Sequence, residues 1–223
     1  EFLYEPVQGA DVVTTIDVEL QKVADEALGD RAGAIVALDP RTGELLALAS
    51  HPFFDPNRVE EDWEELIDDP HKPLFNRAAS GQYVPGSTYK LITLATALEA
   101  GVVSPQTTFK NAGEIVVNGF RIKYTNPPNR QTFDLRDAFA FSVNAAFAEI
   151  GLKLGAERLV EGATRFGFGE APPLEGIPTA ESRLSSSEGF LRGRPALAST
   201  AFGQGEPRAT CCCETNPDRG RWR

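Results

Sequence analysis

Two neighbouring strand-like runs place the strongest constraint on the fold of this chain. Residues 33–39 (GAIVALD) and 44–50 (ELLALAS) are apolar at nearly every position, and residues 40–43 (PRTG) between them have the composition of a hairpin turn. A strand with only one face in the core would alternate polar and apolar residues. We therefore expect an α/β fold in which helices pack on both faces of the sheet.

The segment before this hairpin predicts a strand and a helix. Residues 12–16 (VVTTI) read as a short strand, and Asp17 stands where a helix cap is expected. Gly29 is a suitable end for this helix. Its predicted apolar face consists of Leu20, Val23, Ala24, Ala27 and Leu28.

The rest of the chain reads as one continuous domain up to about residue 206, with no internal repeat. Helices are expected over residues 87–98 (ending before Gly101), 134–141, 145–154 and 156–166. A Pro-rich loop (51–58), a short acidic surface helix (60–69), a strand-and-turn excursion (105–132) and an irregular stretch (167–195) are expected between and after them. Asn118-Gly119 is a hairpin signal within the excursion.

Charge and composition exclude several classes of function. The net charge of -10 over 223 residues argues against a nucleic-acid partner, because phosphates repel an acidic surface. No apolar run approaches the length of a membrane span, and no signal peptide is visible. Because the chain begins at Glu1 and contains no Met, we expect it to be a piece of a longer protein.

A metal centre or other cofactor is not expected. The three cysteines are adjacent, at residues 211–213, and lack the Cys-x-x-Cys spacing of a zinc site. The two histidines, His51 and His71, have no other ligands near them in the sequence.

The stretch 83–90 (YVPGSTYK) carries the chemical signal. Pro85-Gly86 predicts a turn, and the apolar run after it predicts a helix buried nearly all round. Ser87 and Lys90, three residues apart, fall on one face of its first turn. A serine becomes nucleophilic when a neighbouring base takes its proton, and burial can lower a lysine pKa from about 10.4 far enough to supply that base. The positive end of the helix would favour a developing oxyanion.

Two other interpretations of Ser87 stay open at this point. The serine could be a helix N-cap, since Ser-x-x-Lys arises by composition about once in a chain of this length. A Ser-His-Asp triad that uses His51 or His71 is also possible, because such triads depend on geometry rather than on sequence order.

Several stretches together resemble the transpeptidase domain of penicillin-binding proteins, over about residues 10–206. The similar segments are 12–21, 33–57, 76–90, the Ser-Val-Asn at 142–144, and 201–205 (AFGQG). The sequence of residues 39–57 and 83–90 resembles class B members more than class A members. The resemblance implies an antiparallel sheet with helices on both faces, the fold shared with serine β-lactamases.

The resemblance also implies residue roles. Ser87 would be the nucleophile, acylated by the D-Ala-D-Ala end of a peptidoglycan stem peptide, and Lys90 its base. Ser142 would relay a proton to the leaving group, and Asn144 would bind the substrate amide and help to hold Lys90. β-Lactam antibiotics would trap the acyl-enzyme. The partners implied are stem peptides, β-lactams and membrane proteins of the division or elongation machinery, on the extracytoplasmic face of a bacterial membrane, with an anchor outside this sequence.

The sequence departs from the family after residue 206. The third motif, Lys-Thr/Ser-Gly, is missing, and Arg41-Thr42-Gly43 lies in the hairpin turn before Ser87. We expect residues 207–223 (PRATCCCETNPDRGRWR) to be a non-native tail, most simply from a frameshift, and residues 1–206 to be an incomplete domain whose later strands are missing. Such a chain would expose an apolar sheet edge, fold poorly and take up little penicillin.

Two alternative functions remain. A serine β-lactamase of the same fold would release the acyl group rapidly, whereas a transpeptidase would hold it. A non-catalytic binding or scaffold remnant would form no adduct.

Overall fold

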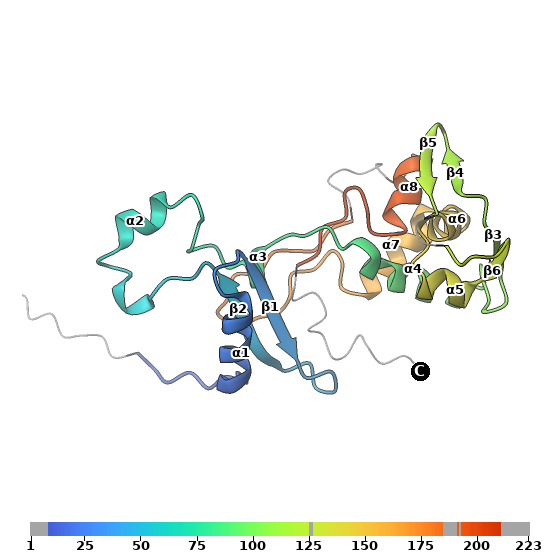
Figure 1. Cartoon of the computed structure of the whole chain (residues 1–223). Coiled ribbons are helices and arrows are strands. Elements are labelled where there is room, and N and C mark those ends of the chain that lie inside the picture. The colour runs from blue at the N-terminus through green and yellow to red at the C-terminus, as the bar shows by residue number, and fades with distance from the viewer. Residues whose placement is uncertain (1–8, 125–126, 185–190, 192, 211–223) are drawn as a thin grey trace, which may run out of the picture.

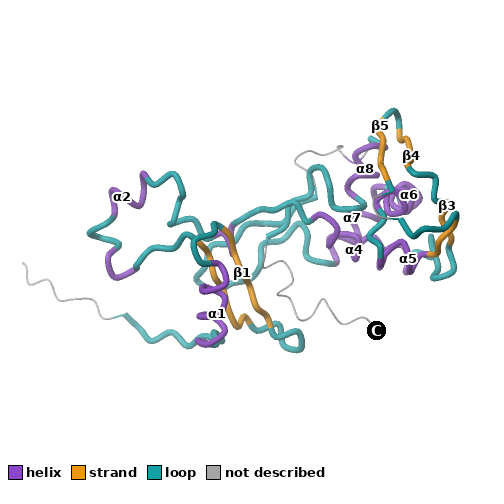
Figure 2. The backbone as a smooth tube through the Cα atoms, viewed as in Figure 1, coloured by secondary structure: helices purple, strands orange, loops and turns teal. Residues whose placement is uncertain are grey.

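The computed structural model describes residues 9–124, 127–184, 191 and 193–210, and its elements fall into two groups joined by extended segments (Figure 1, Figure 2). The first group contains α1 (Val18–Leu28), β1 (Gly33–Leu38), β2 (Leu45–His51), η1 (Pro56–Arg58), α2 (Trp63–Asp68) and α3 (Arg77–Ser80). The second contains η2 (Gly86–Tyr89), α4 (Lys90–Glu99), β3 (Thr108–Lys110), β4 (Glu114–Val117), β5 (Phe120–Lys123), β6 (Thr132–Asp134), α5 (Leu135–Ala140), α6 (Asn144–Leu154), α7 (Ala156–Arg165) and α8 (Arg194–Thr200).

The predicted hairpin forms and carries a helix on each face. β1 and β2 pair antiparallel, with Ile35 opposite Ala49. Ala47 and Ala49 pack against α1. Ser50, whose side chain points to the opposite face, accepts a hydrogen bond from the backbone amide of Arg77 at the start of α3. The expectation of cover on both faces is therefore confirmed, although α3 is only 4 residues long.

The predicted strand over residues 12–16 does not form. Asp17 N donates to Leu46 O, and Thr15 Oγ1 donates to Leu45 O, so this segment touches the edge of β2 without a ladder of backbone hydrogen bonds. Val12 and Val13 are exposed. A strand needs repeated pairing with a neighbour, and a β-rich composition alone does not supply one.

Helix α1 begins as predicted but buries less of its apolar face. The Asp17 carboxylate accepts from the backbone amides of Glu19 and Leu20, and Gly29 follows the last helical residue. Of the predicted apolar face, Ala24 and Leu28 are buried, while the other three residues are exposed. The two-stranded hairpin is too narrow to cover the whole face.

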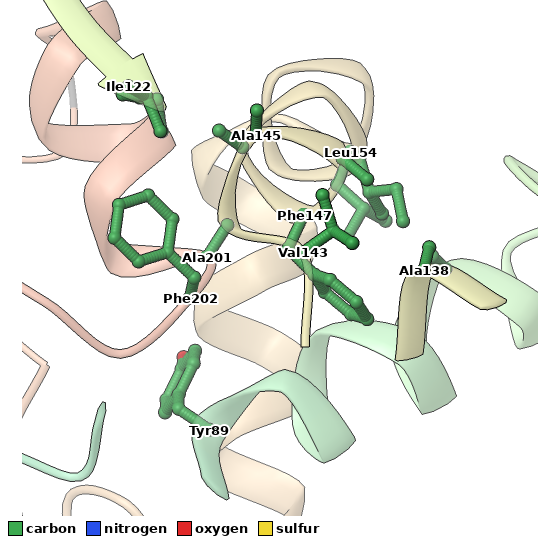
Figure 3. Packing of buried hydrophobic residues seen from close by; sticks show 14 of the residues in the cluster. Tyr89, Ile122, Ala138, Val143, Ala145, Phe147, Leu154, Ala201 and Phe202 are labelled. Atoms are coloured by element: carbon green, nitrogen blue, oxygen red, sulfur yellow. The ribbon is translucent and has the colours of Figure 1, made fainter. Parts of the chain in front are cut away.

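The larger hydrophobic core is built around α6, against which α4, α7 and α8 pack (Figure 3). Helix α6 buries Phe147 and Ile150 completely. Gly151 allows the close approach of α8, because a Cβ there would collide with Ala201. The excursion lies at the edge of this core as the hairpin β4–β5, and Asn118 and Gly119 at its turn have φ angles of 49° and 84°.

Helix α4 is not buried all round, contrary to the prediction. Ile92, Thr93 and Ala97 face the core, but the side chains of Leu91 and Leu98 are 50% and 40% exposed. An open apolar cavity of about 440 Å³ lies against the Leu91 side of the helix. An apolar run predicts a helix that is buried between other elements, but α6 and α7 cover only one side of α4.

The later part of the chain follows the prediction in outline. Helices α5, α6 and α7 match the expected segments to within a residue or two, whereas α8 begins inside the stretch 167–195 that was expected to be irregular. Residues 207–210 form isolated antiparallel bridges with two other segments, in which Ala209 pairs with Tyr83 and Arg208 with Arg183. The rest of the predicted tail, residues 211–223, lies outside the described residues. Among the described helices, none combines the length and the apolar composition that crossing a bilayer requires.

Candidate active site

The turn before α4 places Ser87 and Lys90 side by side. Gly86 has a φ of 57°, which the missing Cβ permits, and it is the first residue of a single turn of 3-10 helix (η2). In a 3-10 helix, side chains at i and i+3 eclipse one another. Lys90 Nζ accordingly lies 3.0 Å from Ser87 Oγ, as the spacing predicts.

Ser142 directs two oxygen atoms at the same amine. It follows α5 and has a φ of 53°, an uncommon value for a residue other than glycine. Lys90 Nζ lies 2.7 Å from Ser142 Oγ and 2.8 Å from the Ser142 carbonyl oxygen. Strained backbone of this kind concentrates at functional sites and costs about 1–3 kcal/mol.

Asn144, the first residue of α6, completes the polar surroundings of Lys90. Its Oδ1 lies 2.7 Å from Nζ. Val143 between the two polar residues is fully buried, so the core fixes the short segment that presents Ser142 and Asn144. The structure therefore brings all four predicted site residues together around one amine.

Burial shapes the chemistry of that amine. Lys90 is only 1% exposed, whereas Ser87 is exposed and can be reached by a substrate. Burial lowers the pKa of Lys90 to about 8. Lys90 belongs to none of the ion pairs among the described residues, so no nearby carboxylate restores its charge.

The four contacts suit a neutral amine. Two of the acceptors, the Ser142 carbonyl and the amide oxygen of Asn144, cannot donate. A neutral lysine has two N–H groups for these acceptors and one lone pair. That lone pair can accept a proton from the hydroxyl of Ser87 or of Ser142. The arrangement can therefore deprotonate one serine and return a proton through the other.

Sequence reasoning missed two further features of the site. The ring of Phe147 lies 5.7 Å from Lys90 Nζ, and its place one turn after Asn144 on α6 was the only available signal. The stretch 201–205 was among the segments that resemble the transpeptidase domain, but no role in the site was predicted for it. The Ala201 carbonyl accepts from Thr93 Oγ1, and the Gly203 carbonyl accepts from Gly86 N, so this stretch holds the turn that precedes Ser87.

The histidine alternative finds no support at His51. Its Nδ1 lies 2.8 Å from the carbonyl oxygen of Gly29, and its Nε2 lies 3.1 Å from Asp25 Oδ1. Both nitrogens are thus engaged with α1 and the residue that ends it. His51 joins the end of β2 to that helix.

Comparison with known proteins gives a consistent result. The penicillin binding protein transpeptidase domain, as a family, matches residues 33–210. The peptidoglycan D,D-transpeptidase PbpA of Mycolicibacterium smegmatis is 37% identical over 215 residues, which cover 88% of this chain and 43% of the relative. The peptidoglycan D,D-transpeptidase MrdA of Acinetobacter baumannii is 32% identical over 219 residues, which cover 92% of this chain and 33% of the relative.

Solved structures agree in fold. The ceftriaxone acyl-enzyme complex of penicillin-binding protein A from M. tuberculosis superposes with a TM-score of 0.81 at 34% identity, over 90% of this chain and 48% of that one. PBP2 of Pseudomonas aeruginosa in complex with WCK 5153 gives a TM-score of 0.81 at 34% identity, over 92% and 48%. The chain therefore spans less than half the length of these relatives.

Proposed function

This chain belongs to the penicillin-binding protein transpeptidase family, and from that premise we propose that it carries the acylation site of a class B peptidoglycan D,D-transpeptidase. The observation that carries the proposal is the buried amine of Lys90, held between Ser87 Oγ at 3.0 Å and Ser142 Oγ at 2.7 Å. Its substrate is the D-Ala-D-Ala end of a stem peptide.

Acylation begins with the neutral form of Lys90. The Ser87 oxygen attacks the carbonyl carbon of the penultimate D-Ala, while its proton passes to Lys90 Nζ. The new C–O bond replaces the peptide C–N bond, and the proton passes through Ser142 Oγ to the departing amine of the terminal D-Ala. An amine of a neighbouring stem peptide then attacks the ester carbonyl, which forms the cross-link and releases Ser87.

Asn144 serves both the base and the substrate. Its Oδ1 accepts a hydrogen bond from Lys90, which orients its NH₂ group for donation to a carbonyl of the bound peptide. The contacts of Lys90 Nζ are with uncharged oxygen atoms, so they orient the amine without supplying a counter-charge that would favour its protonated form. β-Lactams enter the same step, since ring opening by Ser87 leaves a stable ester.

The names of the relatives support a proposal for the cellular setting of the whole protein. Two of them are called peptidoglycan D,D-transpeptidases, so we place this protein at the cell wall, on the extracytoplasmic side of the membrane. Partners among the membrane proteins of division or elongation, and an anchor in another part of the protein, belong to the same proposal.

Labelling with a fluorescent penicillin tests the proposal. The full-length protein, expressed from its whole gene, is labelled, digested with trypsin and mapped. We expect one adduct, on Ser87, and none in a Ser87→Ala variant. An adduct on another serine would overturn the assignment. The 223-residue chain, labelled in parallel, measures whether this part of the domain suffices for acylation.

The lifetime of the adduct separates the alternatives. An ester that persists for hours supports a transpeptidase, whereas release within seconds indicates a β-lactamase. Absence of any adduct on folded full-length protein indicates a binding or scaffold role. Ser50→Ala is a useful control, because Ser50 is engaged with Arg77 in the first group of elements and should not affect labelling.

A further inference from the structure

Phe147 is a fully buried aromatic residue next to the candidate base. It lies on α6 one turn after Asn144, and the side chains at these positions share a face of the helix. Its ring centroid lies 5.7 Å from Lys90 Nζ. The ring also packs against Phe139 of α5, with 6.2 Å between the two ring centroids. The amine of Lys90 therefore meets polar atoms from Ser87, Ser142 and Asn144 and an aromatic surface from Phe147.

Among the described residues, no acidic side chain forms an ion pair with Lys90. The titratable residues on the elements packed against η2 and α4 are Tyr89, Glu99, Glu149, Lys153, Glu157, Arg158, Glu161 and Arg165. Glu149 accepts from Tyr124 Oη at 2.8 Å, and Glu99 pairs with Arg165. Burial is the only cause that lowers the pKa of Lys90. Whatever keeps water from Nζ therefore controls its proton affinity.

We propose that Phe147 is a positioning residue that keeps Lys90 in its neutral, basic form by closing the amine off from water. The inference deepens the proposed function and rests on it for its catalytic meaning. A buried ring of this size excludes water from one side of the amine, while the polar atoms of Ser142 and Asn144 accept its N–H groups on the others.

An aromatic ring exerts two opposing effects on a neighbouring amine. Its π face attracts an ammonium ion, which raises a lysine pKa. Its apolar bulk removes water, which lowers the pKa. Because the amine lies close to the outer limit of about 6 Å for the first effect, we infer that the second dominates. The two effects predict opposite responses to truncation of the ring.

Titration of Lys90 by NMR provides the test. The full-length protein, expressed from its whole gene, is prepared with ¹³C-labelled lysine, and the Cε signal of Lys90 is identified by its loss in a Lys90→Arg variant. The midpoint is then measured in wild type, Phe147→Ala and the milder Phe147→Val. Both truncations should raise the midpoint, with a shift of about one unit or more for Phe147→Ala, because water reaches Nζ.

Ile150→Ala is the matched control. Ile150 is as fully buried on α6 but has no contact with Lys90 among the described interactions, so its truncation should lower stability and leave the midpoint unchanged. A wild-type midpoint near the ordinary lysine value, or an unchanged or lower midpoint in Phe147→Val, would overturn the inference. Should Phe147→Ala not fold, Phe147→Val decides.

The readout is independent of catalysis. A low Lys90 midpoint that rises on truncation, in a protein that penicillin never acylates, would support the role of Phe147 and remove the proposed function. Acylation at Ser87 with a midpoint that Phe147 does not influence would do the reverse.

Discussion

The backbone of Gly203 lies directly against that of Gly86. Gly86 N donates to Gly203 O at 2.9 Å, and Gly203 has a φ of 76°. A Cβ at position 203 would overlap the carbonyl of Gly86. This contact joins the stretch 201–205 to the turn that presents Ser87, so a residue far along the chain helps to hold the proposed nucleophile in place.

Gly203→Ala should therefore disturb the nucleophile turn. The positive φ costs an alanine about 1–2 kcal/mol, and the overlap with Gly86 adds about 1–3 kcal/mol of strain or forces the turn to move. Gly176→Ala is the control, since its φ of 75° is within a degree of that of Gly203 and nothing lies within 4 Å of a Cβ added there. Thermal melts and penicillin acylation of both variants check this; equal losses would show that the contact with Gly86 is unimportant.

Lys90→Arg should nearly abolish acylation of the full-length protein. Arginine keeps the positive charge but stays protonated, so it cannot accept the proton of Ser87. The second-order rate of acylation should fall by at least about 100-fold, the lower range for loss of a general base. Lys153→Arg, at an exposed position of α6, should acylate normally. Wild-type rates in Lys90→Arg would make Lys90 a structural residue.

Acylation should rise with pH up to about 8. Burial lowers the pKa of Lys90 to about 8, so about one molecule in ten holds the neutral amine at pH 7. The rate should increase close to tenfold per unit below that pKa and level off above it. Rates measured from pH 6 to 10 check this, and a profile that is flat below pH 8 would contradict it.

The same pKa links stability to pH. Between pH 8 and about 10.4 the lysine is protonated in the unfolded chain and neutral in the folded chain. The free energy of unfolding therefore increases as the pH rises through that window. Below pH 8 both states are protonated, and the cost of burying the charge is present in full. Lys90→Met should remove this contribution from the pH dependence of urea unfolding.

Asn144→Asp should shift the whole profile to higher pH. The substitution places a carboxylate where Oδ1 now lies 2.7 Å from Nζ, and an opposite charge at that distance raises a lysine pKa by about 1–3 units. Acylation at pH 7 should fall about tenfold or more and recover partly at high pH. Asn57→Asp, within η1 of the first group of elements, adds the same charge without replacing a contact of Lys90. A loss that is uniform at every pH would point to substrate binding by Asn144 instead.

Local pattern predicted the elements whose formation depends on local rules. The hairpin of 33–39 and 44–50 and the Asp17 cap appear within a residue or two of their predicted positions, because turn chemistry and capping are local. The strand at 12–16 failed because a strand requires a partner. The exposure of Leu91 was missed because an apolar run does not reveal how many neighbours surround it.

In the candidate site too, the contact between residues close in sequence could be predicted, whereas the contacts between distant residues could not. The spacing of Ser87 and Lys90 predicted their contact, since it spans one turn. Ser142 and Asn144 were placed by resemblance alone, because 52 and 54 residues separate them from Lys90. The role proposed for Phe147 depends on the distance from its ring to Nζ, and no sequence pattern specifies such a distance.

The two separate cores imply two classes of backbone amide. The cluster around α1 and the hairpin contains four buried apolar residues, three of them alanines, whereas the cluster around α6 contains Phe147, Ile150 and many more. Regions with few buried contacts open at lower free energy than the global unfolding step. In heavy water, the amides of β1 and β2 should exchange for deuterium well before those of α6. All four residues around the amine of Lys90 would then sit in the slowly exchanging part.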